Sequence, residues 1–346
     1  MTMMTKTGRD VTFDVLKGMA ILAMIAGHCF IPLPLHHFIY IWHMPLFFLI
    51  SGYFFHEKPE GVMIHGICRG LLVPYAITAM FIWFCILLSD IIIGGGKELL
   101  MNQGVGLLAI NGLLDNPERY GGIYKCGPIW FLLALGWMRA IYNVLHCMKQ
   151  NWLLLTVLFG VMSYGISRYN HNIYLPFFML QGLASLIFYH IGYLLKTNMC
   201  SLVNKKKEIL LMALPAPIVG MLQTGLDIWG LWFSNWIMNV YAAIGTSILL
   251  YVLVKRTVSV VHPGKIVAGG IMVLAHFGRL SILLLALHSI EKCLNLSEHI
   301  MDLQNIFMPD GYAYRLLNII LQFSFCIGGL FLVERIRFVR RLYNIR

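Results

Sequence analysis

The sequence predicts an all-α, polytopic integral membrane protein of about ten transmembrane helices, with both termini cytoplasmic. Three observations predict it. The 346 residues are 59% hydrophobic and 12% charged, whereas a soluble domain carries about 25% charged residues. Apolar runs long enough to cross a bilayer recur along the whole chain. Lysine and arginine are concentrated in alternate connecting segments, which is typical of membrane topology.

The apolar runs predict ten spans in order. The first is interpreted as a retained helix, because it lacks a small-x-small cleavage site and a second apolar run follows at once. No change of composition marks a soluble domain, so we expect one membrane domain over residues 1–346, with its core at 13–333 and a basic tail at 334–346. The spans are 13–31, 38–55, 71–94, 128–146, 152–167, 174–195, 208–223, 236–254, 268–290 and 315–333.

Basic residues orient these spans. With the termini inside, most lysines and arginines fall in inner segments, including the tail ERIRFVRRLYNIR. The outer segments then hold only Lys97, Arg119, Lys125, Arg168, Lys292 and Arg315. This bias predicts cytoplasmic termini in the plasma membrane. It also accounts for the net charge of +11 through contact with anionic lipid, without a nucleic-acid partner.

The first span carries ionisable residues at two depths. Lys17 and His28 are eleven positions apart in DVLKGMAILAMIAGHCF, so they project from nearly the same helix face, about 16 Å apart along the axis. Asp14 lies one turn before Lys17 and can pair with it. An ionisable residue within a membrane helix suggests function, although an interfacial lysine and a helix-end histidine are the simpler interpretations.

The second span, IYIWHMPLFFLISGYFF, carries His43 at the outer depth of His28 and Ser51 near its other end. Two histidines at one depth on adjacent helices predict either a site or a mutual hydrogen bond. Histidine suits proton transfer near neutral pH, so His28 and His43 are the candidate catalytic residues. Tyr40 is interpreted as part of an interfacial aromatic belt.

Later spans add further candidates. Arg69 and Tyr75 mark a basic start to the third span, and Trp130 starts the fourth after a Gly-Pro break. In the ninth span, Arg279 and His288 are nine positions apart, which places them on opposite sides of one continuous helix. Substrate-binding or structural polar roles are assigned to a final group: Asp14, Ser51, Arg279, Ser281 and His288.

Several chemistries lack their motifs. The eight cysteines are scattered without metal-ligand spacing, so we expect packing roles for them and no metal. Neither a G-x-S-x-G nucleophile nor an H-E-x-x-H zinc motif nor a Walker A loop occurs.

Five stretches together resemble the membrane acyltransferase family 3, and within it the branch of fucose 4-O-acetylase-type sugar O-acetyltransferases. They are DVLKGMAILAMIAGH (14–28), FIYIWHMPLFFLISGYFF (38–55), RGLLVPY (69–75), PIWFLLAL (128–135) and GRLSILLLALH (278–288). Many members carry arginine eleven positions before the first-helix histidine. Here Lys17 stands in its place, which keeps the charge and loses bidentate binding.

The resemblance implies a ten-helix fold and transfer of an acyl group from acyl-CoA, usually acetyl-CoA, to a sugar hydroxyl of a polysaccharide or glycolipid. On this hypothesis His28 is the general base and His43 orients the acceptor. Lys17, Arg69, Tyr75 and Trp130 then bind the donor. Direct transfer and an acyl-histidine intermediate both stay open.

Two other classes remain. One is an exporter or flippase of a glycan or small molecule without acyl chemistry, although the sequence shows no inverted repeat of broken helices. The other is a structural member of a glycan-assembly complex. Chemical modification of an acceptor, as opposed to its movement, separates the enzyme from the exporter.

Overall fold

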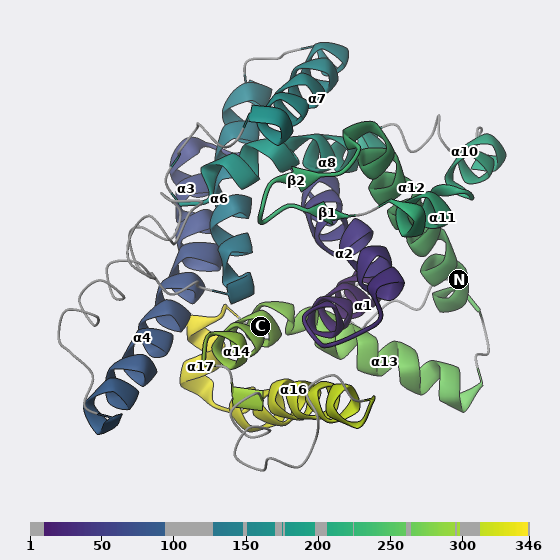
Figure 1. Cartoon of the computed structure of the whole chain (residues 1–346). Coiled ribbons are helices and arrows are strands. Elements are labelled where there is room, and N and C mark those ends of the chain that lie inside the picture. The colour runs from purple at the N-terminus through teal and green to yellow at the C-terminus, as the bar shows by residue number, and fades with distance from the viewer. Residues whose placement is uncertain are drawn as a thin grey trace. The chain divides into compact units, whose positions relative to one another are not determined.

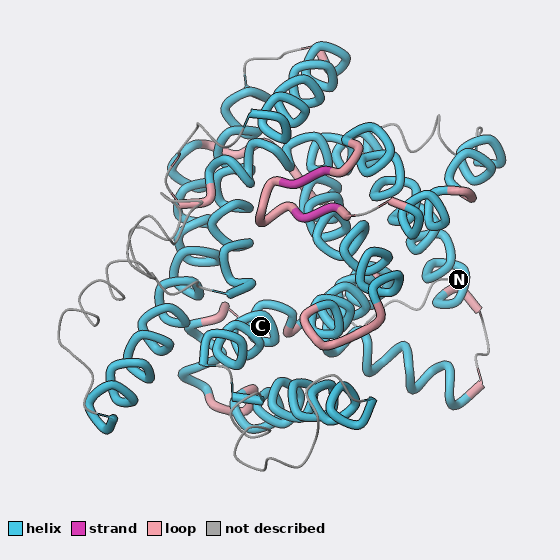
Figure 2. Tube along the Cα trace, viewed as in Figure 1, coloured by secondary structure: helices cyan, strands magenta, loops and turns pink. Residues whose placement is uncertain are grey.

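The computed structural model describes residues 10–93, 127–147, 151–169, 175, 177–197, 206–223, 225–260, 264–294, 296–297 and 312–344. These residues form helices joined by short loops, with one small hairpin of two-residue strands (Figure 2). The prediction of an all-α membrane protein is confirmed at this level. The hairpin is an addition that the apolar pattern did not indicate.

Six helices of the described chain are long and apolar enough to cross a membrane, and the broken pair α13–α14 could form a seventh. The predicted count of about ten spans and the cytoplasmic termini stay predictions. Residues 1–9, 94–126 and 345–346 are among those that lie outside the described residues. The six spans are Leu33–Tyr53, Glu60–Leu88, Gly127–His146, Trp152–Tyr169, Trp236–Val258 and Ala313–Val333.

The chain divides into two compact units, and the first comprises residues 1–56, 152–160 and 185–281. Its centre is the pair α1–α2, which packs against α12, while α13 packs along α1 (Figure 1). The first part of α7 (Trp152–Tyr169) and the last part of α8 (Met179–Thr197) belong to it. Its other elements are α1 (Val11–Gly27), α2 (Leu33–Tyr53), α10 (Lys206–Ala213), α11 (Ala216–Leu222), β1 (Leu226–Asp227), β2 (Trp232–Phe233), α12 (Trp236–Val258) and α13 (Lys265–Arg279).

The second unit comprises residues 57–151, 161–184 and 282–346. In it, α6 packs on α3 and on the π-helical turn that follows α3. The remaining parts of α7 and α8 belong here. Its other elements are α3 (Glu60–Ile67), the π-helix η1 (Cys68–Leu72), α4 (Val73–Ile93), the 3-10 turn η4 (Gly127–Ile129), α6 (Trp130–Cys147), α14 (Ser281–Leu294), α16 (Tyr312–Val333) and α17 (Arg337–Leu342).

Local sequence explains the starts of the helices around the site. Asp10 caps α1, with its Oδ1 accepting a hydrogen bond of 2.9 Å from the Thr12 amide, and Asn235 caps α12 in the same way. Pro34 lies in the first turn of α2, where its missing N–H costs nothing. α1 and α2 pack against each other as an antiparallel hairpin. The ring of Phe13 lies against that of Tyr53 at one end of it.

The basic tail is anchored in the second unit. The Tyr343 hydroxyl lies 2.8 Å from Thr78 Oγ1 on α4. Burial raises the pKa of Tyr343, and its hydrogen bond with Thr78 partly opposes this shift. The phenol therefore keeps its proton, and α17 is held to α4 while Arg337 and Arg340 on α17 are exposed.

Three predicted spans differ from the structure. The segment 208–223 is two short helices, because Pro215 interrupts it between α10 and α11. The helical run that was predicted at 71–94 begins earlier, at Glu60, and passes through a π-helical turn in which the Val73 amide bonds to the Cys68 carbonyl. The segment 268–290 breaks at Leu280, where α13 ends and α14 begins.

Candidate functional site

Close packing of α1 against α13 fixes the inner part of the first helix. A Cβ atom at Gly278 would collide with the backbone carbonyl of Asp14, and one at Gly18 would collide with Leu274. Only glycine allows this approach, as in other membrane helix pairs. Asp14 is thereby buried, with 1% of its surface exposed, and Lys17 Nζ lies 3.5 Å from its Oδ1. The predicted Asp14–Lys17 pair is present.

His28 lies at the other end of α1, as its C-terminal cap. Its Nδ1 is 3.4 Å from the hydroxyl of Tyr40 on α2, and the two rings meet edge to face at 6.0 Å. The turn between the helices brings these residues together. The predicted histidine is therefore held by a phenol on the neighbouring helix.

His43 lies on the same face of α2, one turn after Tyr40. Its side chain is 3% exposed, and its Nδ1 lies 2.8 Å from the Ile39 carbonyl oxygen. A carbonyl oxygen can only accept, so Nδ1 carries the proton and Nε2 presents the lone pair. The His43 and Tyr40 rings are 5.1 Å apart. The two predicted histidines thus meet through Tyr40.

His36 completes what we call the Tyr40 cluster: His28, His36, Tyr40 and His43. The His36 ring stacks on Tyr40 at 4.0 Å. Its Nδ1 is buried, and it has no hydrogen-bond partner among the described residues. Sequence reasoning missed His36 and interpreted Tyr40 as interfacial. The spacing H-x3-Y-x2-H, which places all three on one helix face, could have found them.

An acidic residue approaches the cluster from the hairpin. Strand β1 packs on α2 (Figure 1), and the Asp227 carboxylate acts electrostatically on Tyr40. The Trp229 amide donates a hydrogen bond of 3.0 Å to Asp227 Oδ1 and holds the carboxylate in its turn. No motif around Asp227 in the sequence indicated that it would lie near this cluster. The cluster combines imidazoles, a phenol and a carboxylate, which can position a hydroxyl and move its proton.

The other predicted donor-binding residues lie in the second unit. Arg69 is exposed within the π-helical turn, and Tyr75 is buried in α4, 6% exposed. Trp130 starts α6 with its ring 5.9 Å from that of Phe178. Ser51, in the first unit, is half-buried near the end of α2.

The prediction that Arg279 and His288 occupy opposite sides of one helix was wrong. It assumed a continuous helix, but α13 ends at Arg279 and Ser281 starts α14. Arg279 is exposed and Ser281 is half-buried. The periodicity that relates positions along one helix therefore does not extend across Leu280.

His288 joins a buried polar network between α14 and α16. Its Nδ1 lies 3.8 Å from Glu291 Oε2 and 3.9 Å from Cys326 Sγ. Ser297 donates a hydrogen bond of 2.6 Å to Glu291, and Asn318 and Gln322 extend the chain along α16. The bond from Ser297 satisfies Glu291 Oε1, which lowers the cost of burying this carboxyl group inside the protein. These contacts assign His288 a place in helix packing.

The described residues contain no group of three or more histidine, cysteine, aspartate or glutamate side chains placed to hold a metal ion. The candidate site is therefore described by its protein groups alone.

Comparison with known proteins gives one match. The acyltransferase 3 family model, described as an acyltransferase domain, matches residues 10–333. No curated protein and no solved structure matches significantly. The matched range contains the Tyr40 cluster, the Asp14–Lys17 pair and every other predicted site residue.

Proposed function

The chain belongs to the acyltransferase 3 family, whose members are membrane acyltransferases, and we propose that it acetylates a sugar hydroxyl of the cell envelope. Acetyl-CoA is the proposed donor, and a polysaccharide or glycolipid is the acceptor, as in the fucose 4-O-acetylase-type branch that the sequence resembles. The proposed location is the plasma membrane. We therefore test acyl transfer first, in preference to export of a glycan or small molecule without acyl chemistry.

The observation that carries this proposal is the Tyr40 cluster at one end of the α1–α2 hairpin. His28 and His43 come from different helices and meet at one phenol. An arrangement of imidazoles around a hydroxyl-bearing ring is suited to positioning an acceptor hydroxyl and accepting its proton. The buried His43, with its proton on Nδ1, offers Nε2 as an acceptor for a hydrogen bond.

His28 acts as general base in the proposed reaction. It accepts the proton of the sugar hydroxyl while the sugar oxygen attacks the acetyl carbonyl of the thioester. The new C–O bond forms as the C–S bond breaks, and coenzyme A leaves as a thiolate. The thiolate takes up one proton, and His28 releases the proton it accepted, so the reaction is balanced. Tyr40 holds the His28 ring in place through the 3.4 Å contact.

The acceptor has two further candidate partners. His36 Nδ1 is buried without a hydrogen-bond partner among the described residues, so a neighbouring sugar hydroxyl can satisfy it. The Asp227 carboxylate beside Tyr40 can accept a hydrogen bond from another hydroxyl. A buried polar group that gains its hydrogen-bond partner from the substrate also discriminates against molecules that lack the matching hydroxyl.

The donor is assigned to cations at the other end of α1 and in the second unit. Lys17 carries a charge that Asp14 compensates at 3.5 Å, and Arg69 is exposed in its π-helical turn. Anionic phosphates of coenzyme A suit such groups. Tyr75 and Trp130 stay predicted contacts of the donor.

The first prediction tests the base. In a strain that lacks the wild-type gene, His28→Ala at normal expression should lower acetylation of surface glycans by about 10²–10⁴-fold, the usual contribution of a general base. Mass spectrometry of the glycans measures loss of the acetyl mass and identifies its carrier.

His56→Ala is the matched control, because His56 is an exposed histidine of the same unit that lies outside the Tyr40 cluster. It should leave acetylation unchanged. Near wild-type acetylation by His28→Ala would remove His28 from the catalytic role. Glycans that carry the same groups in the deletion strain and the parent would contradict the acetyltransferase itself.

A further inference from the structure

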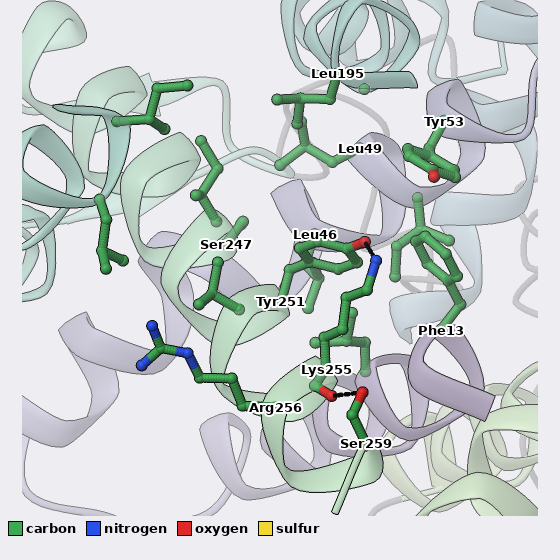
Figure 3. Close-up of a pocket in the computed structure, with 17 residues that line it drawn as sticks. Phe13, Leu46, Leu49, Tyr53, Leu195, Ser247, Tyr251, Lys255, Arg256 and Ser259 are labelled. Carbon is green, nitrogen blue, oxygen red and sulfur yellow. Dashed lines mark hydrogen bonds between the residues drawn. The ribbon is translucent and has the colours of Figure 1, made fainter. Parts of the chain in front are cut away.

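An apolar groove lies in the first unit, at the opposite end of the α1–α2 hairpin from the Tyr40 cluster. It has a volume of about 380 Å³, within the range of about 300–1,000 Å³ typical of ligand sites. Helices α2, α8, α10 and α12 line it with leucine, isoleucine and valine side chains (Figure 3). We call it the α12 groove.

The groove is distinct from the polar face of α1. Phe13 and Leu16 line it, and neither Asp14 nor Lys17 is among its lining residues. The backbone carbonyl of Asp14 lies at the α13 crossing instead. A ligand in the groove therefore does not occupy the Asp14–Lys17 site.

The length of the groove matches one leaflet of a bilayer. Along α12 its lining runs from Ser247 to Ser259, or about 18 Å at 1.5 Å per residue. The hydrocarbon layer of one leaflet is about 15 Å thick, half of the bilayer core. The last part of the groove coincides with the end of the α12 span at Val258, which is the level of a lipid headgroup.

Two cations border this end of the groove. Lys255 and Arg256 diverge from α12, with Lys255 Nζ directed to the Tyr251 hydroxyl at 2.9 Å (Figure 3). Arg256 is exposed. Asp10 is the acidic residue that acts electrostatically on Lys255. These three side chains together carry a net charge of +1, which the single negative charge of a phosphate diester balances.

The chemistry of the lining favours a hydrocarbon chain over the pantetheine arm of coenzyme A. Pantetheine carries two amides, and an amide buried without hydrogen-bond partners is costly. Away from the two cations, the lining offers few polar groups. They are mainly the hydroxyl of Ser247 and the phenols of Tyr53 and Tyr251. Ser247 already donates its hydroxyl to the Ala243 carbonyl.

From this geometry we infer that the α12 groove binds an acidic membrane phospholipid. One acyl chain occupies the groove and the phosphate lies at the level of Lys255 and Arg256. The site holds lipid independently of acyl transfer, so its test does not require the proposed reaction.

The experiment adds phosphatidylglycerol, or phosphatidylcholine with the same chains, to purified protein in neutral detergent. Native mass spectrometry measures bound lipid, and the unfolding midpoint measures its stabilising effect. Phosphatidylglycerol should bind more tightly and raise the midpoint more. Lys255→Gln/Arg256→Gln should weaken its binding about thirtyfold, because each cation contributes about 1 kcal/mol near an anionic headgroup and tenfold corresponds to about 1.4 kcal/mol.

A second variant tests the apolar part. Val252→Trp fills the groove and should also abolish phosphatidylglycerol binding without removing a charge. Its control is Val267→Trp, at a residue of α13 that is 45% exposed. The control for the charge variant is Lys265→Gln/Arg337→Gln, which removes two exposed cations elsewhere. Both controls should retain wild-type binding.

Three results would overturn the inference. Equal binding of the two lipids would remove the role of the cations. Undiminished phosphatidylglycerol binding by Val252→Trp would place the lipid elsewhere. Displacement of phosphatidylglycerol by coenzyme A at equal concentration would identify the groove as a donor site.

Discussion

At the scale of single residues, Tyr40 connects the groups that can do chemistry. Its ring contacts the rings of His28, His36 and His43. Its hydroxyl lies within hydrogen-bond distance of His28 Nδ1. A helix-end imidazole has many rotamers available, and a fixed partner reduces them. Tyr40 is therefore a positioning residue for His28, distinct from the base itself.

The second prediction concerns that hydroxyl. Tyr40→Phe keeps the ring contacts and removes one hydrogen bond, which contributes about 0.5–1.5 kcal/mol. We expect kcat to fall about tenfold at most, since 1.36 kcal/mol corresponds to a factor of about ten. KM and the unfolding midpoint should change little.

Tyr241→Phe provides the comparison, because the Tyr241 hydroxyl donates to the Met212 carbonyl on another helix pair. It should leave kcat unchanged. A Tyr40→Phe enzyme with a lower unfolding midpoint and unchanged kcat would assign Tyr40 to packing alone.

At the scale of helices, glycine crossings set the distances that the site depends on. α1 meets α13 at Gly18 and Gly278, and α2 meets α8 at Gly52 and Gly192. At each crossing a Cβ would strike the backbone of the partner helix. Lipid gives little hydrophobic drive for helices to associate, so close backbone packing supplies much of the stability.

The third prediction uses two glycines of one helix. Gly278→Ala should destabilise the protein by about 1–3 kcal/mol, the usual cost of overpacking, because the new methyl group meets the Asp14 backbone. It should also lower acetylation by displacing α1. Thermal unfolding in detergent and the glycan assay measure the two effects.

Gly269→Ala is the matched variant, since no atom of its surroundings lies within 4 Å of an added Cβ. It should be neutral or stabilising by up to about 1 kcal/mol, because alanine favours helix. Equal destabilisation by both variants would show that the effect comes from the helix backbone and not from the crossing.

At the scale of the whole molecule, the two units divide the proposed roles. The first contains the Tyr40 cluster, the Asp14–Lys17 pair and the α12 groove, and the second contains Arg69, Tyr75, Trp130 and the His288 network. The family match covers both units. The proposed contacts of donor and acceptor are therefore drawn from residues of both units.

The fourth prediction concerns orientation. The distribution of lysine and arginine predicts that both termini lie in the cytoplasm. A fluorescent protein that folds only in the cytoplasm should fluoresce when fused after Arg346, and alkaline phosphatase at the same position should be inactive. The reverse result would contradict the predicted topology, and with it the assignment of donor and acceptor sides. As a control, alkaline phosphatase fused to a protein that is exported to the periplasm should be active in the same cells.

The helical membrane class could be predicted from the sequence alone, because the length and composition of apolar runs are local properties. The family followed from five stretches of sequence, and two of the cluster residues were also found. His28 and His43 stood out since an ionisable side chain in an apolar run is conspicuous. Tyr40 and His36 did not, because an aromatic or histidine near a span end is common at interfaces.

Only the tertiary structure decided which side chains meet. The break at Leu280 separates Arg279 from His288, and hydrophobic periodicity did not reveal it because the apolar run continues on both sides of the break. Asp227 acts electrostatically on Tyr40 from a hairpin that is distant in sequence. Such proximity depends on how the elements pack, and helix crossings are set by backbone approach at residues such as Gly278. Local sequence patterns identify ionisable residues within apolar runs, and tertiary packing determines which side chains they contact.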